Sequence, residues 1–147
     1  MNDLLRELYQ EIILDHNKSP RNRGTVEHPT CEAHGHNPLC GDQVHLGLRV
    51  SDGKIEDIKF EGQGCAISVA SASLMTEAVV GKSVEEALVL SDEFQSMVTG
   101  KDLDKHFSDE LEALAGVREF PARVKCATLA WHALEEALQG KDGCQNA

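Results

Sequence analysis

The sequence lacks several features that define whole classes of protein. Its apolar runs fall well short of the roughly 18 residues that a membrane span needs, and Met1-Asn2-Asp3 does not begin a signal peptide. Basic side chains are scarce: 14 Lys and Arg stand against 25 Asp and Glu, and a net charge of −11 repels a phosphate backbone. We therefore expect a cytoplasmic protein without a membrane partner and without a nucleic-acid partner.

The sequence also lacks a disulfide framework and any C-x-x-C pair. Its five cysteines are Cys31, Cys40, Cys65, Cys126 and Cys144. An odd and scattered set, in a chain without a secretion signal, indicates reduced thiols. Such thiols are inert core residues, metal ligands or nucleophiles.

No repeat, low-complexity tract or linker divides the chain. With 147 residues, of which 41% are hydrophobic and 27% charged, the composition is that of one globular domain with a sizeable core. We expect this domain to span residues 1–140 and to be followed by a disordered tail over residues 141–147.

Hydrophobic periodicity predicts helices at both ends of the chain and through its second half. Apolar residues at steps of three and four predict an N-terminal helix that ends near His16, before Pro20, and we expect His16 to cap or pack there. Ser83 begins a capping-box pattern. The later predicted helices are 66–80, rich in small residues, one that begins at Ser83, one or two short helices within 92–118 closed by Gly100 and Gly116, and a long one over 121–139.

Alternating hydrophobicity predicts a small sheet between the first helix and the others. The expected segments are a short edge strand within 20–39, a strand over 43–50, a turn over 51–54 and a return strand over 55–60. Ile55 lies on the opposite face from Ile58 and Phe60, which predicts an irregularity at the start of the return strand. The chain is therefore predicted to be α+β, with about three antiparallel strands and helices on one face.

Three of the cysteines, Cys40, Cys65 and Cys126, lie at boundaries between predicted elements. Helix N-termini favour the thiolate at Cys65 and Cys126, and Asp42 can point the same way as Cys40. Three thiolates and a carboxylate make a four-ligand set that suits zinc, and clustered thiolates also suit iron–sulfur chemistry. Buried core cysteines are the alternative. The glycines beside Cys40 and Cys65 are expected to leave space for a metal or ligand.

A second constellation competes with this set. Cys31, His34, His36 and Cys40 lie at short spacing and are all usual zinc ligands. A site there leaves the other two boundary cysteines without a role. A cysteine hydrolase needs a base beside its thiol, and no Cys–His pair stands out for that chemistry.

The chain resembles the U-type proteins of iron–sulfur cluster assembly, the IscU/NifU-N/SufU family. The similarity runs from the first predicted helix to the last, in several motifs that keep one order. The matching stretches are Tyr9 with DHNKSPRNRG at 15–24, NPLCGD at 37–42, IEDIKFEGQGCAIS at 55–68, ASAS at 70–73 and FPARVKCATLAW at 120–131.

Three departures make the chain more similar to the SufU branch than to the IscU scaffold branch. The scaffold branch has a histidine before its third cysteine, where this chain has Lys125. The Pro-Pro-Val-Lys chaperone motif of that branch is not kept in residues 120–125. The stretch between Cys65 and Cys126 is longer, with an extra helical segment around 95–118. SufU members bind zinc and receive sulfur from a cysteine desulfurase.

The resemblance implies a zinc-dependent sulfurtransferase in iron–sulfur cluster biogenesis. It assigns Cys40, Asp42, Cys65 and Cys126 as Zn²⁺ ligands, with a cysteine desulfurase and downstream cluster-assembly proteins as partners. A histidine of the desulfurase would replace Cys40 on the metal, and the freed Cys40 would attack the persulfide. Arg123 would pair with Asp42 or steady the persulfide charge. The alternative is a scaffold on which iron, as a transient [2Fe–2S] cluster, binds the same residues.

Overall fold

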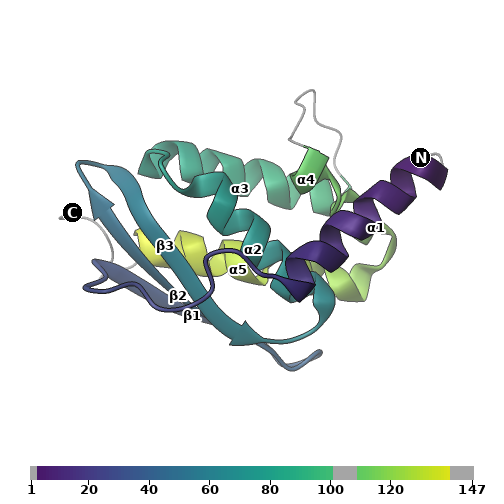
Figure 1. Ribbon diagram of the computed structural model, residues 1–147, viewed down its shortest axis with the longest axis horizontal. Coiled ribbons are helices and arrows are strands. Elements are labelled where there is room, and N and C mark those ends of the chain that lie inside the picture. Colours follow the sequence, from purple (N-terminus) through teal and green to yellow (C-terminus); the bar gives the residue numbers. More distant parts are fainter. Residues whose placement is uncertain (1–2, 101–108, 140–147) are drawn as a thin grey trace.

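The structure, a computed structural model, describes residues 3–100 and 109–139 (Figure 1). It confirms the α+β class, with a three-stranded antiparallel sheet in the order β1-β2-β3. The elements are α1 (Asp3–Lys18), β1 (Cys31–Asn37), β2 (Asp42–Ser51), β3 (Lys54–Gln63), α2 (Ala66–Val79), α3 (Val84–Val98), α4 (Asp109–Glu112), the 3₁₀ helix η1 (Ala115–Glu119) and α5 (Pro121–Gln139).

The sheet buries one face, and a bulge in β3 adjusts which side chains reach it. β2 pairs with β3 in regular register until Arg49 and Asp57, after which Val50 pairs with Ile55. The extra residue in β3 shifts the alternation of side chains. Ile55 therefore joins Ile58 on the buried face, and neither side chain is exposed. The irregularity predicted at the start of this strand is confirmed.

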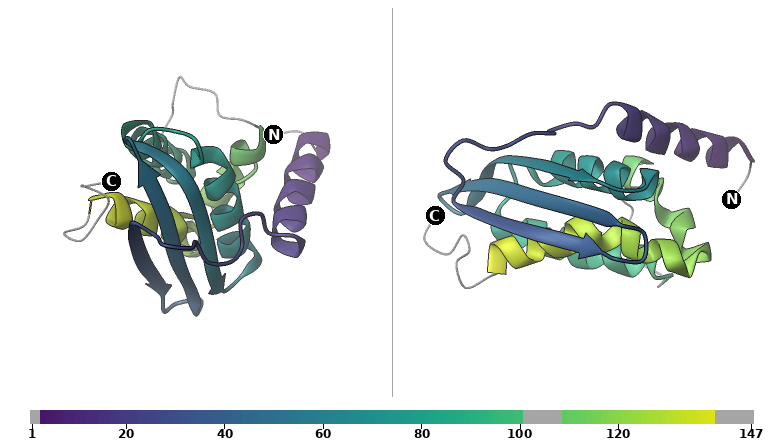
Figure 2. Two further views of the ribbon diagram at one scale, coloured as in Figure 1. Left: turned by 60° about the vertical axis from the view of Figure 1, so that its left-hand side comes forward. Right: turned by 90° about the horizontal axis from the view of Figure 1, so that it is seen from below.

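Helices α2 and α5 cover the buried face of the sheet, as the two views in Figure 2 show. Small residues along α2 allow the two helices to approach closely. The Ser71 hydroxyl donates to the Ala127 carbonyl at 2.5 Å and accepts from Trp131 Nε1 at 3.1 Å. Because Trp131 is fully buried, this network satisfies its indole N–H inside the core.

Helix α1 lies beside α2 and is joined to it by a buried histidine. His16 Nδ1 lies 2.7 Å from the Ser73 hydroxyl, so the packing role expected of His16 is confirmed. α1 runs two residues further than predicted, to Lys18. Within residues 3–100 and 109–139, none of the helices combines the length and the apolar character that a membrane-spanning helix needs.

The second half of the chain corrects two expectations about short helices. Ser83 caps α3 through the predicted capping box with Glu86. α3 continues to Val98, so residues 92–98 are not a separate helix, and the short helices predicted within 92–118 are α4 and η1. Gly116 lies inside η1 and does not end a helix. The predicted tail over 141–147 lies outside the described residues.

Candidate metal centre

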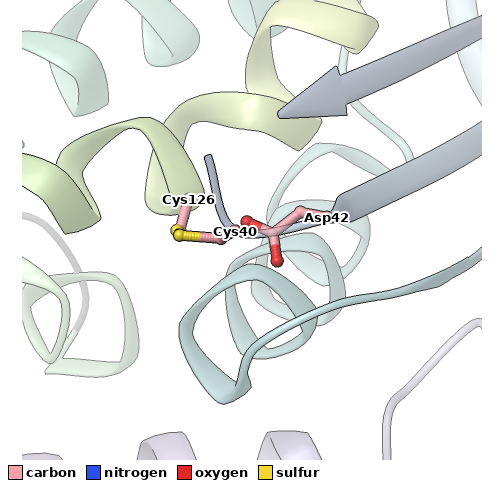
Figure 3. Close-up of side chains that lie close together, drawn as sticks. All are labelled: Cys40, Asp42 and Cys126. Carbon is pink, nitrogen blue, oxygen red and sulfur yellow. The ribbon is translucent and has the colours of Figure 1, made fainter. Parts of the chain in front are cut away.

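The turn between β1 and β2 and the start of α5 bring two cysteines and an aspartate together. Asp42 begins β2 and Cys126 lies in the second turn of α5. One ligand atom each of Cys40, Asp42 and Cys126 lie within 4.8 Å of one another. The two sulfurs face each other 3.3 Å apart, with the carboxylate beside them (Figure 3). Segments more than 80 residues apart thus meet at one point.

The Asp42 carboxylate is fully buried and held by two donors. The backbone N–H of Cys65 donates to Asp42 Oδ1 at 2.8 Å, and Asn37 Nδ2 donates to Asp42 Oδ2 at 3.3 Å. Asn37 Nδ2 also lies 3.6 Å from Cys126 Sγ. A buried carboxylate needs such partners, because an unpaired charge away from water is costly. Asn37 is therefore a positioning residue that the sequence reasoning missed.

Cys65 lies at the edge of this group. It is the N-cap of α2 and is half-buried. Its thiol is close enough to Cys126 and Arg123 to affect the pKa of both, but it is outside the set whose ligand atoms all lie within 4.8 Å. Three of the four expected ligands therefore form one group, and the ligand role of Cys65 stays a prediction.

The thiols and the neighbouring arginine perturb one another. Burial first, and then hydrogen bonds with Asp42, Cys40 and Cys65, raise the pKa of Cys126 far above that of an ordinary thiol. A hydrogen bond with Cys65, the charge of Cys65 and a hydrogen bond with Cys126 raise the pKa of Arg123. The Arg123 guanidinium is therefore close to the Cys65 and Cys126 thiols, and its expected roles, pairing with Asp42 or steadying a persulfide charge, stay predictions.

The donor set fits a metal ion of the zinc or iron class. Sulfur ligands favour such ions over calcium or magnesium, and a carboxylate is an accepted companion ligand. Cys40, Cys65 and Cys126 are free thiols, so they are available for coordination. A bound cation would lower the raised pKa of Cys126, because a cation favours the thiolate.

Gly64 does not leave the expected free space for a metal; it is needed because a side chain there would clash with Asp42. A Cβ there would lie 2.3 Å from Asp42 Oδ1, so the carboxylate occupies the place of the missing side chain. At Gly41, next to Cys40, a Cβ would meet nothing within 4 Å, and φ is +70°. The expected free space therefore exists beside Cys40 and not beside Cys65.

The competing Cys31-His34-His36-Cys40 site is not formed. The side chain of Cys31 is buried in the core on the inner face of β1, whereas His34 and His36 are exposed on the outer face. Alternation along a strand keeps these side chains apart. The Cys31 sulfur is also disulfide-bonded, so the expectation of reduced thiols is wrong for this cysteine.

A cavity of about 610 Å³ lies between α1, the start of α2, the segment that contains η1 and the start of α5. Arg123 lines it together with Ile67 and Phe120. Phe120 is 62% exposed, and Leu39, which precedes Cys40, is 70% exposed. Exposed large apolar side chains are typical of a surface that another protein covers.

Comparison with known proteins gives the family. The NifU-like N-terminal domain matches residues 8–142. The chain is 46% identical over 140 residues to the zinc-dependent sulfurtransferase SufU of Bacillus subtilis, covering 95% of each chain. It is 46% identical over 144 residues to the iron–sulfur cluster assembly scaffold protein IscU of Streptococcus pyogenes, covering 97% of this chain and 89% of the relative.

A solved structure supports the same assignment. The crystal structure of a putative iron–sulfur cluster assembly scaffold protein for the SUF system, from Fervidobacterium islandicum, matches with a TM-score of 0.84 and 38% identity. The match covers 91% of this chain and 98% of the solved one. The motifs around the three thiols, the fold and these matches agree, and the chain belongs to the NifU-like N-terminal domain family of iron–sulfur cluster assembly.

Proposed function

We propose that this chain is a zinc-bound sulfur acceptor, which takes persulfide sulfur from a cysteine desulfurase for iron–sulfur cluster biogenesis. The observation that carries the proposal is the contact between Cys40 and Cys126 beside the buried Asp42, with Arg123 against the thiols. The name and similarity of the Bacillus subtilis relative support it.

In this proposal Cys40, Asp42, Cys65 and Cys126 hold the ion. When bound, zinc would keep the thiolates together without oxidising them, because it has no redox chemistry. The chain's own contribution is the arrangement of donors. Asn37 and the Cys65 N–H hold the Asp42 carboxylate, and helix α5 holds Cys126 in the core.

Cys40 is the proposed acceptor because it is half-buried and lies on a turn, whereas Cys126 is fully buried. Its thiolate attacks the outer sulfur of the desulfurase persulfide. A sulfur–sulfur bond forms on Cys40 as the sulfur–sulfur bond of the desulfurase breaks, and the desulfurase cysteine leaves as a thiolate. Arg123, which faces the thiols, stabilises the negative charge on the transferred sulfur.

The partners and location belong to the same proposal. Leu39 and Phe120 are exposed beside the thiols, and we assign them to the surface that meets the desulfurase. Downstream cluster-assembly proteins would receive the sulfur from Cys40. A cytoplasmic location follows from a reaction that needs reduced thiols.

As a second candidate we propose the scaffold function, with a [2Fe–2S] cluster on the same residues. The similarity to the Streptococcus pyogenes IscU supports it, because the identity equals that to SufU. Lys125 in place of the histidine expected for a scaffold favours sulfur transfer. Metal analysis separates the two. A colourless protein with one zinc supports transfer, and a brown protein after anaerobic reconstitution supports the scaffold.

The direct test follows sulfur from a cysteine desulfurase and free cysteine onto this chain by mass spectrometry. We expect persulfide on Cys40 in the unmodified protein. Cys40→Ala should lose sulfur acceptance and keep part of its zinc. Arg123→Ala should slow acceptance, whereas Lys125→Ala, which removes an exposed cation nearby, should not. Persulfide at the normal rate on the Cys40→Ala protein would refute the assignment.

A further inference from the structure

Three histidines share the outer face of the sheet, opposite the helices. His34 and His36 are exposed on β1, and His45 on β2 is half-exposed. The β1–β2 register places His34 directly opposite His45 and His36 opposite Gln43. Side chains two residues apart on one strand, and opposite residues on adjacent strands, point the same way. The three imidazoles therefore gather on one small area.

The same histidines line a cavity of about 450 Å³ on this face. Its other lining residues include Gly35 between the two β1 histidines and Glu61 on β3. Glu61 lies directly opposite His45 in the β2–β3 register. The area thus offers three imidazoles and a nearby carboxylate around an open space.

We propose that His34, His36 and His45 form a second cation site, which takes a borderline divalent transition-metal ion such as zinc or nickel. Three neutral imidazoles are a sufficient set for such an ion and leave a fourth position open. Two alternate residues of one strand and one residue of its neighbour supply them, so the backbone of the sheet sets their separation.

A carboxylate already contacts one of the three rings. Glu32 Oε1 lies 3.2 Å from His45 Nε2, from the same outer face of β1. A carboxylate that accepts from one ring nitrogen leaves the other nitrogen as the metal ligand. Glu32 therefore acts as a positioning residue for His45 in the proposed site.

The rings of His34 and His45 must rotate for the ion to bind. They stack with centroids 4.3 Å apart and planes within 8°, and stacked rings do not aim their lone pairs at one point. Among the described residues, only Cys40, Asp42 and Cys126 already bring three ligand atoms within 4.8 Å. The histidine side chains are at least partly exposed over a paired backbone, so rotation about their side-chain bonds is open to them.

This site is separate from the thiol centre, because the sheet lies between the two. Asp42 and His45 are three residues apart on β2, and alternation places them on opposite faces: Asp42 is fully buried and His45 is half-exposed. An ion on the histidines would connect the edge strand β1 to β2 without contacting Cys40 or Cys126.

The experiment titrates zinc into the protein that already holds one equivalent at its thiols, and follows heat and histidine imidazole NMR signals. We expect a second, weaker equivalent that shifts the signals of His34, His36 and His45. Removing a residue that only hydrogen-bonds to a metal ligand already lowers metal affinity about 10–100-fold. His45→Ala and His34→Ala should therefore weaken the second equivalent at least about tenfold, and Glu32→Gln by a smaller factor.

His132→Ala is the matched control, because His132 is an exposed histidine with a glutamate nearby on α5. It should leave the second equivalent unchanged. The proposal is overturned if no second equivalent binds, or if the His34 and His45 variants bind it as the unmodified protein does. The difference between these variants and the control is independent of which metal the thiols hold.

Discussion

The backbone N–H of Cys65 donates to Asp42 Oδ1 at 2.8 Å, and this bond connects the start of β2 to the start of α2. It holds one oxygen of the carboxylate in the candidate metal centre. The segment that carries Cys65 thus positions the proposed oxygen ligand, Asp42. Substitutions at either end of this hydrogen bond should therefore affect the whole candidate centre.

Replacing Asp42 tests charge and hydrogen bonding separately. Asp42→Asn keeps an oxygen for the Cys65 N–H but removes the negative charge, so we expect zinc affinity to fall at least about tenfold with the fold retained. Asp42→Ala also leaves the Cys65 N–H without its acceptor, which should cost about 1–3 kcal/mol of unfolding free energy. Chelator competition and urea unfolding measure the two effects. Equal zinc affinity in all three proteins would contradict the ligand role of Asp42.

Gly64→Ala should damage the candidate centre without replacing any of its proposed ligands. The new Cβ would lie 2.3 Å from Asp42 Oδ1, so the carboxylate must move, at a cost of about 1–3 kcal/mol. We expect lower zinc retention after dialysis and a lower melting temperature. Gly116→Ala is the control, because its Cβ would meet nothing within 4 Å. If both variants keep their zinc equally, the contact between Gly64 and Asp42 is unimportant.

The metal-free protein should lose stability at alkaline pH. Burial and the neighbouring acids raise the pKa of Cys126 above its unfolded value, so the folded state keeps a proton that the unfolded chain releases. The stabilising contribution is complete below the unfolded pKa, near 8.5–9, and declines above it by at most about 1.4 kcal/mol per pH unit. Urea unfolding at several alkaline pH values measures this slope. Cys126→Ala should reduce it, and an identical slope in that variant would reject the explanation.

Ser71→Ala should destabilise the junction of α2 and α5. It leaves the Trp131 indole N–H without its acceptor in the core, which should cost about 1–3 kcal/mol. Adding Trp131→Phe removes the unpaired donor, so the double variant should lose less than the sum of the two single changes. Thermal and urea unfolding of the three variants complete the cycle. Strict additivity would mean that the hydrogen bond contributes nothing.

Local sequence patterns predicted most of the fold, because helix ends and strand alternation are determined by residues that are near one another in the sequence. Pro121 begins α5 and Gly140 follows its last residue, and the observed helix has the predicted bounds. The alternation over 43–50 identified β2. The sequence pattern assigned residues from 92 on to short helices, whereas α3 buries Phe94 and Val98 and continues to Val98. Burial against α5, which a local pattern does not contain, decided that boundary.

The candidate site was predictable only in part, since its members come from distant elements. Residue spacing alone left buried core cysteines as an alternative, and it was the family resemblance that predicted that Cys40, Asp42 and Cys126 meet. Asn37 was missed because its role depends on the β1–β2 register, which pairs it with Asp42. A buried polar residue on the inner face of an otherwise apolar edge strand was the available clue. The histidine cluster also depends on the β1–β2 register. The sequence grouped His34 and His36 with Cys31, whereas the register places His45 opposite His34.

The three thiols are held by different kinds of backbone. Cys126 is held in a helix that packs into the core, and Cys65 caps another. Cys40 lies on a short link between two paired strands, beside a glycine with empty space around it and a leucine 70% exposed to solvent. In the proposed transfer, sulfur on Cys40 would therefore stand on the exposed turn, where a recipient could reach it while Cys65 and Cys126 stay in their helices.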